Sequence, residues 1–267
     1  RLQDAGADAY NVAIGFDAGQ AVTTGPYNTL IGGLAGDALT TGDRNVAIGT
    51  SALGAEDTGG KNVAIGANAL YVQDAGADAY NVAVGYNAGV AVTTGTENTI
   101  IGGLAGDALS TGSNNVAIGY NALSTEDTGG RNVAIGKAAL YSLDAGADAY
   151  NIAVGFNAGY SLSTGIKNTL IGGNAGDALT IGNFNVALGY HALTTSVDGD
   201  ANVAIGYEAL GVYEDGDGNG HNTAVGFQSQ TAATTGEYNT SLGSSSMGAG
   251  ATSGDYNVAV GYYAGYA

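Results

Sequence analysis

The clearest ligand pattern in this sequence lies at residues 215–220, which read DGDGNG. Oxygen-bearing side chains occupy alternate positions and the sixth is glycine, as in the first half of an EF-hand calcium loop. The twelfth position of such a loop carries a bidentate Glu, and here it is Gly226. The pattern fits either a partial calcium site at Asp215, Asp217 and Asn219 or a flexible acidic insertion. Calcium is the one cofactor that the sequence suggests.

Other residue types with catalytic or ligand chemistry are sparse. The loops at 4–8, 74–78 and 144–148 each carry two Asp and offer weaker calcium ligands. The two histidines, His191 and His221, belong to different segments, and the chain has no cysteine. No nucleophile–base constellation can be built from these residues, so we expect no enzymatic activity.

The composition restricts the classes of partner. Acidic residues outnumber basic ones 24 to 6, which gives a net charge of −18. Nucleic acids and anionic membranes bind through basic patches, so neither is an expected partner. No apolar run reaches transmembrane length, which predicts that this segment does not insert into a membrane. The 45% hydrophobic content argues against disorder despite 48 glycines.

A repeat organises the whole sequence. Fifteen segments begin with Asn and read Asn-[Val/Thr/Ile]-x-[Ile/Val/Leu]-Gly; positions are counted from this Asn, so the next residue is +1. Most spacings are 17 residues, and a unit of four segments recurs every 70 residues up to about residue 195. We therefore divide the chain into a regular region, 1–195, and a less regular continuation, 196–267. The repeated residues are Asn11, Asn28, Asn45, Asn62, Asn81, Asn98, Asn115, Asn132, Asn151, Asn168, Asn185, Asn202, Asn222, Asn239 and Asn257.

Each segment is predicted to form one coil of a parallel β-solenoid. Residues +1 and +3 are apolar and share a face at period two, which indicates a short strand. We expect a second short strand after the +4 glycine, for example at residues 120–123. Gly occupies position −3 in eleven segments, which predicts a tight turn with positive φ there. The fold class is then an all-β parallel solenoid of about fifteen coils.

Stacked coils place equal positions above one another, with two consequences. The repeated Asn becomes a ladder whose side-chain amides connect neighbouring coils, which is a structural role. A thin coil can bury only one strand face, so an apolar stripe remains outside and favours self-association. Position +5 is Gly where +2 is large, as in Leu30 and Gly33, which suggests volume compensation between touching lanes.

The repeat Asn45-Val46-Ala47-Ile48-Gly49, with a following Ala and a Gly-containing turn, resembles the head repeats of YadA-like trimeric autotransporter adhesins. It is similar also to the YadA-like repeats of phage and other viral tail-fibre proteins. The resemblance covers all fifteen coils and transfers to structural positions only. It implies a left-handed β-roll, a homotrimer, and an extracellular location on a virion fibre or a bacterial surface.

The predicted function is a structural and adhesive segment of an extracellular fibre, which attaches a virus or bacterium to a host or surface. Its partners would be further copies of the chain and a surface glycan or other host receptor. Tyr213 and His221 lie in the irregular region and are the predicted receptor contacts. One alternative is a structural filament subunit without a receptor. A lesser alternative is an ice-binding solenoid, suggested by pairs such as Thr23-Thr24.

Overall fold

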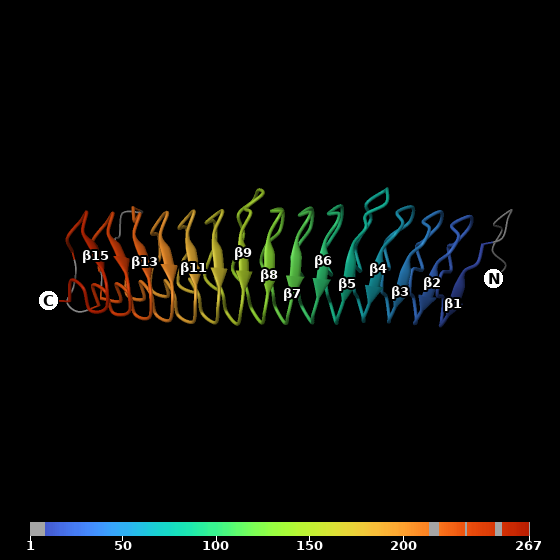
Figure 1. Cartoon of the computed structure of the whole chain (residues 1–267). Helices are drawn as coiled ribbons and strands as arrows, with labels where there is room; N and C mark the ends of the chain where they lie inside the picture. The colour runs from blue at the N-terminus through green and yellow to red at the C-terminus, as the bar shows by residue number, and fades with distance from the viewer. Residues whose placement is uncertain (1–8, 214–218, 233, 249–252, 267) are drawn as a thin grey trace. The chain divides into compact units, whose positions relative to one another are not determined.

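The computed structural model describes residues 9–213, 219–232, 234–248 and 253–266 (Figure 1). Within these residues the chain forms fifteen three-residue β-strands, which pair in parallel as a β-solenoid. This confirms the predicted all-β solenoid class. The chain divides into two compact units, residues 1–131 and 132–267, which are described separately.

Unit 1 contains seven strands among its described residues. Each pairs in register with the next, so Val12 lies opposite Thr29 and Thr29 opposite Val46. The longer loop before β5 projects beyond its neighbours in Figure 1. The strands are β1 (Val12–Ile14), β2 (Thr29–Ile31), β3 (Val46–Ile48), β4 (Val63–Ile65), β5 (Val82–Val84), β6 (Thr99–Ile101) and β7 (Val116–Ile118).

Unit 2 continues the same pattern with eight strands in the part that is described. β11 and β12 pair in register, Val186 with Val203, although the sequence becomes irregular between them. The division at 195/196 stays a prediction. The strands are β8 (Val133–Ile135), β9 (Ile152–Val154), β10 (Thr169–Ile171), β11 (Val186–Leu188), β12 (Val203–Ile205), β13 (Thr223–Val225), β14 (Thr240–Leu242) and β15 (Val258–Val260).

The middle residue of most strands faces the coil interior. Leu30 and Ala47 are buried, whereas the first and third residues of the same strands are half-buried. The size of the residue at position +8 is related to the size of this middle residue, which is at position +2. A Cβ on Gly36 would lie 2.8 Å from Leu30 Cδ2, and in the next coil Ala47 is accompanied by Leu53 at +8. In these two coils a large residue at one of positions +2 and +8 is accompanied by a small residue at the other.

The predicted compensation between +2 and +5 is wrong. Position +2 points inward and position +5 points outward, so the two side chains do not meet. A Cβ built on Gly33 has no atom within 4 Å, and Phe16, at the same position one coil earlier, is 76% exposed.

The predicted second strand is also wrong. At residues 120–123 the backbone is left-handed at Asn121 (φ 55°) and at Leu123 (φ 53°). Alternating left-handed residues curl the chain too tightly for a strand. Coil-to-coil bonds nevertheless continue in this curved segment, as from Gly106 N to Ala122 O at 2.9 Å. These bonds offset the cost of the left-handed conformations.

The glycine at position −3 does not provide the expected positive φ. The positive φ falls two residues later, directly before the Asn, at Tyr27 (62°) and Arg44 (55°). Glycine is needed at −3 because the coils approach closely there: a Cβ on Gly25 would lie 2.1 Å from the Gly42 oxygen. Close backbone contact, rather than turn geometry, explains this glycine.

Candidate functional site

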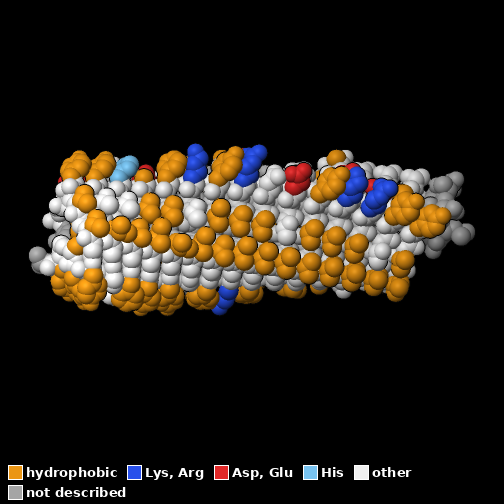
Figure 2. Space-filling model, viewed as in Figure 1, with side chains coloured by type: hydrophobic (Ala, Val, Ile, Leu, Met, Phe, Trp, Pro, Cys, Tyr) orange, Lys and Arg blue, Asp and Glu red, His pale blue; other side chains and the backbone are white. Residues whose placement is uncertain are grey.

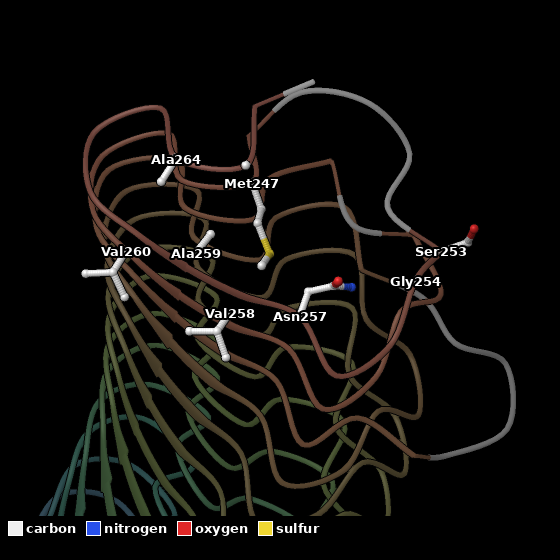
Figure 3. A pocket seen from close by; sticks show the side chains of 9 residues that line it. Met247, Ser253, Gly254, Asn257, Val258, Ala259, Val260 and Ala264 are labelled. Carbon is white, nitrogen blue, oxygen red and sulfur yellow. The ribbon is translucent and has the colours of Figure 1, made fainter.

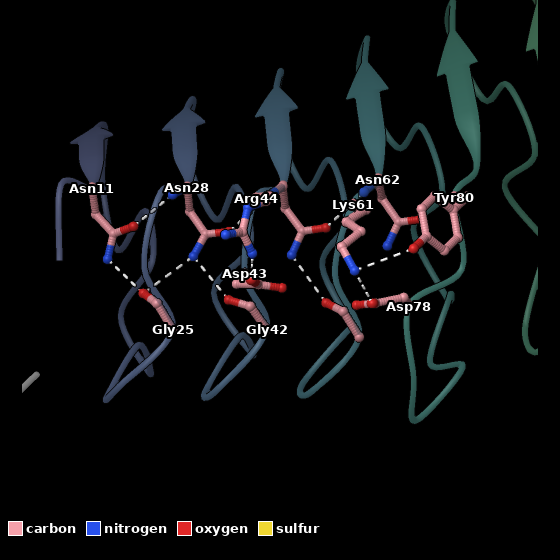
Figure 4. A network of polar contacts seen from close by, with 12 residues as sticks. Asn11, Gly25, Asn28, Gly42, Asp43, Arg44, Lys61, Asn62, Asp78 and Tyr80 are labelled. Carbon is pink, nitrogen blue, oxygen red and sulfur yellow. Dashed lines mark hydrogen bonds and ion pairs between the residues drawn. The ribbon is translucent and has the colours of Figure 1, made fainter.

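Most of the repeated asparagines connect a coil to the following one through both ends of the side chain (Figure 4). The Asn28 Oδ1 accepts the Asn45 N–H at 2.9 Å, and the Asn28 Nδ2 donates to the Gly42 oxygen at 2.9 Å. The same two bonds recur at Asn98, which bonds Asn115 N and Gly112 O. Because these side chains are buried, their amides are committed to the stack and are not available to a ligand.

Two asparagines differ at the longer coils. Asn62 accepts the Asn81 N–H at 3.1 Å, but its buried Nδ2 has no hydrogen-bond partner. The same holds for Asn202, whose Oδ1 accepts the Asn222 N–H at 3.0 Å. The next coil is 19 residues long after Asn62 and 20 after Asn202, instead of the usual 17. These two positions are the least satisfied rungs of the ladder.

Three carboxylates meet between two coils of unit 1. Glu56, Asp57 and Asp74 each place an oxygen within 4.8 Å of the others. Glu56 occupies position +11, a core position elsewhere, and is fully buried. Its oxygens accept the Gly59 N–H at 2.7 Å and the Gln73 Nε2–H at 2.9 Å.

Burial raises the pKa of the Glu56 carboxyl above its usual value. Hydrogen bonds from Gln73, Gly59 and Ala75 act in the opposite direction, and the charge of Asp74 adds to the rise. Since both Glu56 oxygens already bind N–H donors, the group serves to hold the following loop. We do not assign a metal to this cluster.

The predicted calcium loops are placed as follows. Asp215, Asp217 and the loop at 4–8 lie outside the described residues, and Asn219 is exposed. In the 74–78 loop the two carboxylates go to different partners: Asp74 joins Glu56, and Asp78 forms an ion pair with Lys61. Sequence reasoning therefore found Asp74 but missed Glu56, which lies one coil earlier.

The two predicted receptor contacts differ in accessibility. Tyr213 is fully buried, and its hydroxyl donates to the Asn219 oxygen at 3.0 Å, so its ring is not on the surface. It occupies the same core position, +11, as Leu39. His221 is exposed and stacks on the Tyr238 ring, with 4.9 Å between centroids. Only His221 is available to a partner in the described arrangement.

Exposed aromatic rings stack along two rows. At position −1 the Tyr10 and Tyr27 rings lie 5.5 Å apart and nearly parallel. At position +5 the Tyr207 ring stacks on Tyr190 at 5.9 Å and on Phe227 at 5.2 Å. Cations join the first row, since the Lys61 ammonium lies 5.1 Å from the Tyr80 ring centroid.

Between these rows lies the strand face, which comprises the first and third residues of every strand. Figure 2 shows rows of hydrophobic side chains across the strands of each unit. Many of these residues are half-buried by their stacked neighbours, and Ile101, Ile152 and Leu188 are exposed. Valine, isoleucine and threonine predominate here, and the face carries no charged side chain. It is the outer apolar stripe that the repeat predicts.

A cavity of about 540 Å³ opens on the last described coil (Figure 3). Met247, Asn257 and Ala259 line it. Ala259 is at position +2, which the stacked coils on both sides cover in preceding strands. The cavity is thus the uncovered interior of a coil rather than a ligand site.

No known protein family and no curated protein matches this sequence. Among the described residues, no helix is long and apolar enough to cross a membrane.

Proposed function

We propose that this chain is a structural and adhesive segment of an extracellular fibre, in which several copies associate side by side. The observation that supports the proposal is the uncharged strand face. Soluble monomers rarely expose a continuous apolar surface of this kind. Association through the first and third strand residues would cover it, and would leave the loops and the outer side of each coil free.

The stoichiometry that we propose is a homotrimer, as the resemblance to YadA-like repeats implies, with the left-handed winding of that family. Attachment would rest on exposed loops and rings, since the strand and ladder positions are occupied by packing. A non-catalytic role agrees with side chains that are committed to stacking. The extracellular location, on a virion or a bacterial surface, belongs to the same proposal.

The alternatives depend on whether a receptor exists. A structural filament subunit would associate in the same way and bind no surface molecule. The ice-binding alternative has less support, because hydroxyls of its Thr pairs are used within the chain. Thr23 and Thr40 each donate to a backbone oxygen of the next coil, at 3.1 and 3.0 Å.

A charge on the strand face tests the proposal. We expect Ile118→Glu to dissociate the assembly, because it would place a carboxylate in an apolar contact. Val90→Glu is the matched control: Val90 is equally half-buried but lies outside the strand face. Light scattering of both variants, with circular dichroism to confirm folding, gives the result. Equal masses for the two folded variants would contradict an interface on the strand face.

A further inference from the structure

A groove of about 200 Å³ lies on the outer side of three successive coils in unit 1. Asp37, Gly54 and Tyr71 line it, each at position +9 of its coil, and Ser51 contributes a hydroxyl-bearing side chain. The groove lies away from the strand face and takes no part in the asparagine ladder. It is smaller than the usual 300–1,000 Å³ of drug-sized pockets.

In the other two copies of the 70-residue unit, a hydroxyl group donates a hydrogen bond to the carboxylate that corresponds to Asp37. Ser124 occupies the position of Gly54 in the second copy, and its hydroxyl donates to the Asp107 carboxylate at 2.5 Å. Thr194 does the same to Asp177 in the third copy, also at 2.5 Å. Gly54 has no hydroxyl. Asp37 therefore lacks the donor that its two counterparts have.

Tyr71 supplies an apolar platform beside this carboxylate. Its ring lies against Gly54, since a Cβ built there would be 3.1 Å from the Tyr71 Cδ2 and Cε2 atoms. The side chain is 45% exposed, so a ligand can reach the ring. The glycine thus lets the Tyr71 ring pack against the backbone, and the Asp37 carboxylate and this ring line the same groove.

We propose that this groove binds one pyranose ring of a neutral glycan. A sugar hydroxyl would donate to Asp37 in the place that Ser124 and Thr194 hydroxyls take in the other copies. The apolar C–H face of the ring would pack on Tyr71. The inference deepens the proposed attachment role and rests on it.

The charge of the groove selects among ligand classes. Its lining includes a carboxylate and no Lys, Arg or His, and the chain carries a net charge of −18. Sialylated or sulfated sugars would be repelled. A carboxylate and an aromatic ring could also bind a cation. However, the corresponding carboxylates Asp107 and Asp177 accept hydrogen bonds from the neutral hydroxyls of Ser124 and Thr194, which favours a neutral hydroxyl donor at Asp37.

A second groove in unit 2 provides an internal comparison. It has a volume of about 170 Å³, and Thr231, Gly248 and Tyr266 line it in the same order of coil positions. The glycine and the tyrosine are repeated, but a threonine stands where the first groove has Asp37. We therefore place the sugar at the first groove and use the second as a control.

Saturation-transfer difference NMR of the full chain tests the proposal. The probes are methyl pyranosides of glucose, galactose and mannose at millimolar concentration, with N-acetylneuraminic acid and choline as comparators. We expect transfer to ring C–H protons of at least one neutral pyranoside. Gly54→Ser, which installs the residue of the second copy, and Tyr71→Ala should each weaken binding at least tenfold. Gly248→Ser should leave it unchanged.

Three results would overturn the inference: no transfer to any neutral pyranoside, transfer undiminished in folded Gly54→Ser, or binding of choline alone. Because either substitution alone could cause a folding defect, both Gly54→Ser and Tyr71→Ala are tested. Thermal melts identify a variant that does not fold. Light scattering on the same samples separates the two proposals. An oligomer that binds no sugar refutes only the groove, whereas a monomer that binds sugar refutes only the side-by-side fibre.

Discussion

Replacement of Asn98 by alanine should show how much one rung of the ladder stabilises the stack. The change removes the acceptor of the Asn115 N–H and the donor to the Gly112 oxygen, both at 2.9 Å. Each bond contributes about 1 kcal/mol, and each buried group left unpaired costs about 1–3 kcal/mol. We therefore expect the free energy of unfolding to fall by about 2–4 kcal/mol.

Asn62→Ala is the matched control. Its Nδ2 already lacks a partner, so only the Asn81 N–H loses an acceptor, and the buried orphan donor is removed with it. We expect a loss of about 1 kcal/mol or less. Urea unfolding followed by circular dichroism at one fixed protein concentration measures both variants. An unchanged midpoint for Asn98→Ala, or equal losses for the two, would refute the assignment of the bonds.

Three further predictions address packing, pH and calcium. Gly36→Ala should destabilise the chain by about 1–3 kcal/mol through its clash with Leu30, whereas Gly33→Ala should change thermal stability by about 0.5 kcal/mol at most. The raised pKa of Glu56 contributes stability that is complete below the unfolded pKa and lost as pH rises through the folded pKa. The stability of Glu56→Gln relative to the native chain should thus increase between pH 4 and 7, and a pH-independent difference in urea midpoints would contradict this. Calorimetry should detect at most weak calcium binding that Asp217→Ala abolishes; tight binding that survives the change would place the site elsewhere.

The strands could be predicted because their signal is local. Asn, alternating apolar residues and a +4 glycine recur at each strand, and β1 and β15 begin where the pattern places them. The curled segment was missed because Leu53 adopts a left-handed conformation (φ 53°) that leucine rarely takes. Position +8 is glycine at Gly19 and Gly36 and leucine at Leu53. The glycines at this position are the signal that could have revealed the left-handed backbone.

The sites were harder to predict because they join residues one coil apart. Glu56 and Asp74 are separated along the chain, and only the coil period brings them together. The same register places Tyr213 at the core position of Leu39, which would have excluded it as a surface contact. Comparison of Gly54 with Ser124 across the repeat copies would have indicated the groove.

The mass of the native chain in solution tests the central claim most directly, because side-by-side association is what the strand face is proposed to provide. Multi-angle light scattering at micromolar concentration should give three times the 26.1 kDa chain mass. A folded, stable monomer under the same conditions would contradict the account, since the strand face would then be an exposed surface without a partner.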